Sequence, residues 1–204
     1  MKSLKKNQLS ELKSEMPKLD NKELLSIIGG DRYYFDQDGH YRLIPEQSNN
    51  DIIIIGNNQM TLSGSLNVLD SGNNSGVRFT GTGVSAELFT FLAQNTNVEW
   101  AYAFNSGEAG GLIGTSHQTN QVDLSSGNWT DYGTIAHNHG VNNDMSRWEL
   151  EEYNGLPSQS DIEYLKKNNK QSGVIYNETT GEMCPYNIYS TTQEDWLREH
   201  GYWH

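Results

Sequence analysis

The sequence predicts an α/β (α+β) fold in which a mixed β-sheet is flanked by helices. Three observations support this prediction. The chain has 204 residues, enough for one sizeable domain with a small appendage but not for two full-sized domains. Patterns typical of helices and strands alternate after residue 80. Residues 31–80 show short strand and turn patterns, and residues 1–30 differ from the rest in the sign of their charge.

Composition excludes several classes of protein and partner. The formal net charge of −12 disfavours nucleic acid or an anionic membrane surface as a partner. No run approaches the roughly 18 apolar residues of a membrane span, which excludes a transmembrane helix. Cys184 is the single cysteine, which excludes an internal disulfide framework and a cysteine-rich zinc site.

The first thirty residues form a segment of their own. They hold six lysines and four acidic residues, a net charge of +2, whereas the remainder carries −14. Apolar residues recur at roughly helical spacing until Pro17, and the segment ends in Gly29-Gly30. No apolar core of about 7–15 residues follows the lysines, so the segment is not a Sec signal.

The end of this segment resembles a double-glycine leader peptide through Leu24, the Ile27-Ile28 pair and Gly29-Gly30. The resemblance implies a peptidase-containing ABC transporter as partner, cleavage after Gly30, and secretion of a protein made in the cytoplasm. An amphipathic helix would dock in a groove of the peptidase, and two residues without side chains would fit a narrow slot. The alternative is an ordinary N-terminal helix that ends at a glycine C-cap.

Residues 31–80 form the predicted N-terminal β-rich segment. Arg32–Pro45 has two aromatic runs around Asp38-Gly39, a strong hairpin-turn signal. Ile52–Ile55 is fully apolar and predicts a buried strand. Residues 57–80 are rich in Asn, Ser and Gly, which predicts weak strands or a loop.

Residues 81–204 hold the predicted main domain. Ser85 is a plausible N-cap of a helix whose apolar stripe includes Leu88 and Leu92. Further helices are expected over Ser158–Lys167, capped by Ser158 or Ser160, and over Gln193–His200. Strands are expected over five segments: Val98–Phe104, Gly110–Ser116, Thr134–His137, Gly173–Tyr176 and Met183–Tyr189.

The residues that carry chemistry begin with His137 and His139. Residues i and i+2 of a strand point to the same side, so the two imidazoles can grip one metal ion. Asp161, at a predicted helix start, can supply a third ligand. Two histidines and one carboxylate with an open position compose a catalytic zinc site, which activates water at neutral pH. Glu99 is predicted to lie in the middle of an apolar strand, where a buried carboxylate is costly unless it has a partner or a function, so it is the candidate proton shuttle.

The order Glu99, His137-x-His139, Ser158-x-x-Asp161 resembles the motif of the JAB/MPN/JAMM metallopeptidases, and its context resembles the JAB-like toxin branch. The resemblance covers about residues 80–190 and implies a JAB/MPN-like sheet flanked by helices. It implies Zn²⁺ bound by the two histidines and Asp161, with Glu99 as general base and then acid. Ser158 would donate a hydrogen bond to the oxyanion. It also implies a peptide or isopeptide substrate, and it makes an immunity protein a candidate partner.

Two departures from the family pattern keep alternatives open. Asn138 and Gly140 stand where the family commonly has Ser or Thr and Pro, and the insertion Val141–Pro157 is expected to loop out over the site. Glu108 competes with Glu99 for the role of base. The chain is therefore expected to be a zinc metallopeptidase exported as a bacterial toxin, with an inactive JAB-fold binding module and a bacteriocin-like secreted protein as the alternatives.

Overall fold

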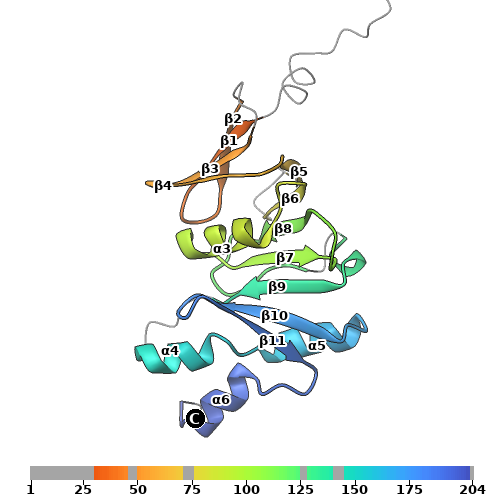
Figure 1. Ribbon diagram of the computed structural model, residues 1–204. Coiled ribbons are helices and arrows are strands. Elements are labelled where there is room, and N and C mark those ends of the chain that lie inside the picture. The colour runs from red at the N-terminus through yellow and green to blue at the C-terminus, as the bar shows by residue number, and fades with distance from the viewer. Residues whose placement is uncertain (1–29, 46–49, 71–75, 125–127, 140–144, 203–204) are drawn as a thin grey trace, which may run out of the picture.

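The computed structural model describes residues 30–45, 50–70, 76–124, 128–139 and 145–202, which form two β-sheets and their flanking helices (Figure 1). One sheet has four strands in the order β2-β1-β3-β4, and the other has seven in the order β11-β10-β9-β7-β8-β6-β5. Both sheets contain parallel and antiparallel neighbours. The predicted α/β class with a mixed sheet is therefore confirmed. The predicted leader, apart from Gly30, lies outside the described residues.

The four-stranded sheet is built from the N-terminal segment. The predicted hairpin is present as antiparallel β1 (Asp31–Phe35) and β2 (Tyr41–Pro45). Gly39 in its turn has a φ of 78°, and a Cβ there would lie 2.8 Å from the Val98 side chain, so only glycine fits. The predicted strand β3 (Ile52–Ile55) runs parallel to β1, and β4 (Asn58–Thr61) closes the sheet. Only alternate isoleucines of β3 are fully buried, since one face of this sheet is partly open.

The seven-stranded sheet holds the rest of the strands. Adjacent strands in this sheet are antiparallel, except for β9 and β10, which are parallel. Residues 57–80, predicted as weak strands or a loop, form β4, β5 and most of β6, and β6 spans the predicted division at residue 80. The strands are β5 (Asn67–Asp70), β6 (Val77–Gly81), β7 (Trp100–Phe104), β8 (Gly111–Thr115), β9 (Thr134–Asn138), β10 (Ser172–Asn177) and β11 (Glu182–Asn187).

Helices cover both faces of this sheet. Helix α3 (Ala86–Asn95) and the four-stranded sheet share one apolar cluster with Trp100 and Tyr102 of β7, and α3 is capped by Ser85 as predicted. Ala101 and Ala103 belong to a second cluster on the opposite face, which includes Trp129 of the short helix η1 (Trp129–Asp131). Helix α5 (Gln159–Lys167) covers β10, and α6 (Gln193–Glu199) lies at the end of the molecule farthest from β1 (Figure 1).

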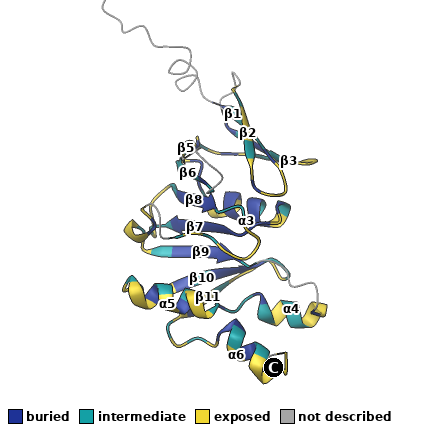
Figure 2. Ribbon diagram, turned by 180° about the vertical axis from the view of Figure 1, so that it is seen from behind, coloured by how far each residue is buried: buried dark blue, intermediate teal, exposed yellow. Residues whose placement is uncertain are grey.

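The insertion before α5 differs from the expectation of a plain loop. It carries helix α4 (Arg147–Tyr153), whose Ser146 and Glu149 form a capping box. Serine followed by glutamate three residues later is a sequence signature of such a box, so the pattern was available and was missed. Figure 2 shows α4 with exposed and half-buried residues beside a sheet whose central strands are mostly buried. No helix among the described residues is long and apolar enough to cross a membrane.

Candidate metal centre

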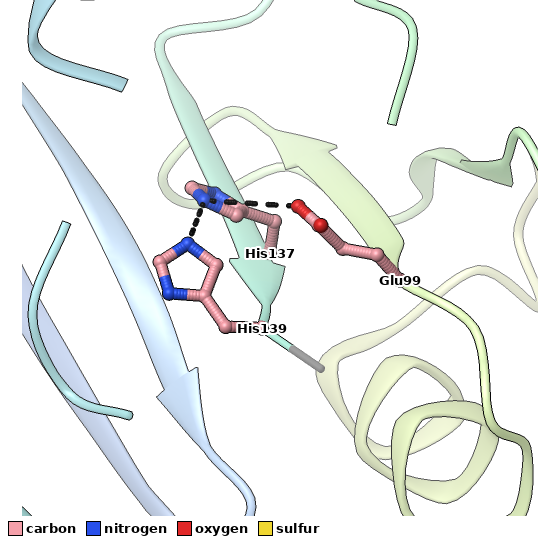
Figure 3. A group of neighbouring side chains, drawn as sticks. All are labelled: Glu99, His137 and His139. Carbon is pink, nitrogen blue, oxygen red and sulfur yellow. Dashed lines mark hydrogen bonds and ion pairs between the residues drawn. The ribbon is translucent and has the colours of Figure 1, made fainter. Parts of the chain in front are cut away.

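The two histidines of the His-x-His pattern lie at the end of β9. His137 is inside the strand and pairs with Ala101 of β7, so it points to the sheet face that α5 covers rather than to the face of α3. His139 follows the last residue of β9 and points to the same side. The two Nε2 atoms lie 3.0 Å apart (Figure 3).

Asp161 brings a carboxylate from α5 to these imidazoles. Its Oδ1 lies 3.0 Å from His137 Nε2, and its Oδ2 lies 3.3 Å from His139 Nε2. The local fold fixes this placement, because Ser158 caps α5 and donates both its backbone N–H and its hydroxyl to Asp161 Oδ2, each at 2.7 Å. Of the two predicted caps, Ser158 is therefore the one used. Its hydroxyl serves the carboxylate in this structure, and its oxyanion role stays a prediction.

The separations between the two Nε2 atoms and the two Asp161 oxygens are close to those of a zinc site. In a tetrahedral site with nitrogen and oxygen ligands at about 2.0–2.2 Å, neighbouring ligand atoms lie roughly 3.3–3.6 Å apart. The separations of 3.0–3.3 Å fall within a few tenths of an ångström of that range. The structure thus brings together the residues that the sequence singled out, and their binding of zinc stays a prediction.

Glu99, the residue just before the neighbouring strand β7, faces the histidines (Figure 3). The prediction that it lies mid-strand is wrong: β7 begins at Trp100, because the Glu99 N–H donates to the Gln118 carbonyl in a loop rather than to a strand. Its Oε1 lies 4.0 Å from His137 Nε2. One ligand atom each of Glu99, His137 and His139 lies within 4.8 Å of the others, so this buried group can hold a metal ion.

Burial and neighbouring charges shift the pKa values of this group. Burial raises the pKa of Glu99 to about 7, against an opposing effect of His137. Burial alone would lower the pKa of His137, but the adjacent Asp161 carboxylate raises it to about 9. Burial lowers the pKa of His139. The two imidazoles hold the pKa of Asp161 far below its usual range despite burial. Without metal, His137 and Asp161 thus form an ion pair at neutral pH.

Asn138, between the two histidines, was seen in the sequence only as a departure from the family pattern. Its Oδ1 accepts a hydrogen bond of 2.7 Å from the Trp100 N–H, and its Nδ2 donates to the Val98 carbonyl at 3.4 Å. These two backbone groups flank Glu99 on either side. The same Nδ2 donates to Glu178, whose pKa burial raises to about 7. Asn138 therefore ties the histidine strand to the backbone that carries Glu99.

Gln193 is a second residue that sequence reasoning missed. Its Nε2 lies 2.8 Å from His139 Nδ1 and 3.3 Å from the carbonyl of Tyr153, at the end of α4. Its own N–H donates to the Pro157 carbonyl, just before α5. Only 8% of the residue is exposed. No local pattern points to it, because 54 positions separate it from His139.

The site opens into a cleft. Glu99, His139 and Asp161 lie on its wall with Ser158, and further walls come from residues 119–124 and from Tyr153 and Tyr164. Glu108, the competing base, is exposed in the turn before β8, where Asn105 donates to it at 3.0 Å. It does not line the cleft. Of the two candidates, Glu99 is therefore the one placed beside the histidines.

A mixed α/β fold with buried histidines and carboxylates beside an open cleft is an arrangement suited to a metal-dependent hydrolase. Residues 78–166 match the family model of JAB-like toxin 1. The predicted resemblance to the JAB-like toxin branch is therefore confirmed over this range. The range contains Glu99, His137, His139, Ser158 and Asp161, whose roles stay predictions. Strands β10 and β11 and helix α6 lie beyond it. No curated protein and no solved structure matches the chain.

Proposed function

We propose that this chain is a zinc-dependent metallopeptidase or isopeptidase of the JAB type that is exported as a bacterial toxin. The observation that supports this proposal most is the convergence of His137, His139 and Asp161, with ligand atoms 3.0–3.3 Å apart, beside a buried Glu99. The match of residues 78–166 to JAB-like toxin 1 supports it independently.

The chain's own residues divide the chemistry between them. His137, His139 and Asp161 would hold Zn²⁺, which supplies a Lewis acid and activates water at neutral pH when bound. Glu99 takes the proton from the attacking water and delivers it to the leaving amine of the peptide or isopeptide bond. A base is most effective when its pKa lies near the working pH, and burial raises the pKa of Glu99 to about 7.

The Ser158 hydroxyl would have two hydrogen-bond acceptors in this mechanism: the Asp161 carboxylate and the oxyanion of the substrate. Its hydroxyl donates to Asp161 and lies on the cleft wall. Rotation of this hydroxyl away from the carboxylate would let it donate to the oxyanion that develops on the substrate carbonyl. The backbone N–H of Ser158 would still hold Asp161 during that rotation.

The decisive experiment compares the wild-type protein with Glu99→Gln and with Glu108→Gln as matched control. All three should bind about one zinc per chain. Wild type and Glu108→Gln should kill susceptible cells and produce new peptide termini in a terminal-peptide proteomic screen, whereas Glu99→Gln should do neither, since general acid–base catalysis contributes about 10²–10⁴-fold. Zinc binding without new termini in any form would favour an inactive binding module. Killing by Glu99→Gln would favour a bacteriocin-like protein that acts through its surface.

Export is the part of the proposal that rests on the N-terminal segment. The sequence to Gly29-Gly30 would direct the chain to a peptidase-containing ABC transporter, and the exported protein would begin at Asp31. N-terminal sequencing of protein from the medium of cells that express both chain and transporter tests this. Any other start, or equal export of a Gly29→Asp variant, would overturn the leader proposal without affecting the zinc site.

A further inference from the structure

Asp51, just before β3, is a buried carboxylate that the catalytic proposal does not use. It is only 3% exposed. Its Oδ1 accepts a hydrogen bond of 2.8 Å from the backbone N–H of Asp31, and its Oδ2 accepts one of 2.6 Å from the N–H of Leu66. Asp51 thus joins the first residue of β1 to the segment before β5. The Asp31 nitrogen that donates to Asp51 is the nitrogen of the Gly30–Asp31 peptide bond.

We propose that Asp51 is the receptor site for the processed N-terminus of the mature protein. The proposal rests on cleavage after Gly30. Water adds across the Gly30–Asp31 bond, so that Gly30 leaves with a carboxylate and the Asp31 nitrogen becomes an amine, which takes a proton from solution. The resulting ammonium stands where the Asp31 amide stands now, 2.8 Å from Asp51 Oδ1. The donor to the Asp51 carboxylate changes from a neutral amide to an ammonium, so that the attraction between two opposite charges in a buried setting is added to the hydrogen bond.

The surroundings of this amide favour a positive charge. The Asp31 carboxyl lies close enough to Asp51 that burial and the charge of Asp51 raise its pKa. The same two carboxylates and burial raise the pKa of Tyr33. An ammonium on Asp31 would offset this concentration of negative charge. Gly30 itself is buried with a φ of 90°, a backbone conformation that favours glycine, so the position has a structural reason to be glycine as well.

The test uses chains that differ only at the N-terminus: the full chain, a chain beginning at Gly30 and a chain beginning at Asp31. Every helix and strand that the structure describes lies between residues 31 and 199, so the shortened chains keep them all. The chain beginning at Asp31 should unfold about 2–4 °C above the chain beginning at Gly30, the shift expected when a chain of this size gains one strong interaction. The Gly30 chain carries its ammonium one residue too far away and serves as the matched control.

Two further experiments distinguish the ion pair between the Asp31 ammonium and Asp51 from general effects of shortening the chain. In an Asp51→Asn background the difference between the two chains should vanish, even though both lose stability because the amide group confronts one of the two N–H donors. Selective carbamylation of the α-amine should abolish the gain in the wild-type background, which covers the case in which Asp51→Asn does not fold. Equal unfolding temperatures of the Gly30 and Asp31 chains, or a gain that survives carbamylation, would overturn the proposal. This outcome is independent of the natural cleavage site, which N-terminal sequencing reports.

Discussion

The four-stranded sheet and the candidate metal centre bury different kinds of side chain. The sheet buries mainly rings and aliphatic chains such as Tyr33, Phe35 and Ile53. The metal centre buries Glu99 and His137, together with other polar side chains. Apolar burial contributes stability at roughly 25 cal/mol per Å², whereas a buried polar group costs free energy unless it is paired. The sheet should therefore set stability, and the metal centre should set the response to metal and pH.

The largest expected effect is the loss of zinc from the metal centre when both histidines are removed. The His137→Ala/His139→Ala variant should lose its metal, because a site with three protein ligands cannot spare two of them. His200→Ala is the matched control, since His200 is an exposed histidine at the end of α6 and belongs to neither group of described residues that could hold a metal ion. Zinc content of the dialysed proteins is the measurement. Stoichiometric zinc in the double variant would contradict the assigned site.

The converse change tests the N-terminal sheet. Phe35 is 5% exposed, and its ring packs 5.8 Å from those of Tyr41, Phe79 and Trp100. Phe35→Ala should lower the free energy of unfolding by about 3–5 kcal/mol, while the folded fraction keeps its zinc. Denaturant unfolding with zinc analysis measures both.

The neighbouring Tyr34, half-buried on the opposite face of β1, provides the control for this change. Tyr34→Ala should cost much less than Phe35→Ala. Equal losses for the two variants would mean that this sheet is not held by the core on its inner face.

Some of the features behind these predictions can be predicted from the sequence, and others cannot. The hairpin, α3, α5 and the neighbouring pair of His137 and His139 follow local patterns with a period of two or 3.6 residues, and the structure has all of them. The Ser158 cap and Asp161 are also local, three residues apart. Such patterns are visible because the physical interaction that creates them acts between near neighbours in the chain.

The parts that the sequence did not reveal are long-range contacts. Asn138 reaches Val98 and Trp100 across about 40 positions, and Gln193 reaches His139 across 54. The start of β7 depends on which backbone groups find a partner in the neighbouring strand, so Glu99 fell just outside it. Polar residues of this kind carry no periodic signal, and only the fold identifies their partners.

The candidate metal centre and its neighbour Glu178 should contribute much of the pH response. Folding raises the pKa of His137 from its ordinary value to about 9, so the stability that it contributes is complete below pH 6.5 and is lost as the pH rises through about 9. Folding raises the pKa of Glu99 and of Glu178 from 4.5 to about 7, so the stability that they contribute at low pH is lost between about pH 4.5 and pH 7. Burial lowers the pKa of His139, which opposes this decline as the pH rises towards 6.5. The metal-free protein should therefore lose stability between about pH 4.5 and pH 9, most clearly above pH 6.5, where His137 titrates.

Unfolding curves of metal-free protein at several pH values measure this decline. Glu99→Gln should flatten its lower part, because the amide does not titrate. Phe35→Ala should lower the whole curve without changing its slope, since no titrating group is removed. A decline that is identical in wild type and Glu99→Gln would show that other groups control the response.

A smaller effect is expected from Gln193, which holds His139 through Nδ1. A ligand histidine that binds metal through Nε2 carries a proton on Nδ1, so the metal-bound form needs an acceptor there and the amide must present its oxygen. Gln193→Ala should weaken zinc binding about 10–100-fold, and Gln193→Glu, which can only accept, should restore most of it. Competition with a chromophoric chelator measures the affinity. Arg198→Ala, an exposed change on α6, should leave it unchanged, and equal losses for the alanine and glutamate variants would contradict this orientation.

The smallest expected effect concerns the cap of α5. Ser158→Ala removes the hydroxyl that accepts from the Asp161 N–H and donates to its carboxylate, which should cost about 1 kcal/mol of stability. Ser160→Ala is the matched control, because Ser160 was the rival cap, lies two residues further on and is exposed. Zinc affinity should fall only modestly in Ser158→Ala, since the backbone N–H of residue 158 still holds Asp161 Oδ2.

If catalysis by Ser158→Ala falls by about 10²–10³-fold at nearly full zinc occupancy, the loss is larger than the loss of a helix cap can explain. The hydroxyl would then be assigned to stabilising the oxyanion. If catalysis falls no more than the losses of stability and zinc content account for, Ser158 has a structural role only. Its function is then to hold the carboxylate of Asp161 in place.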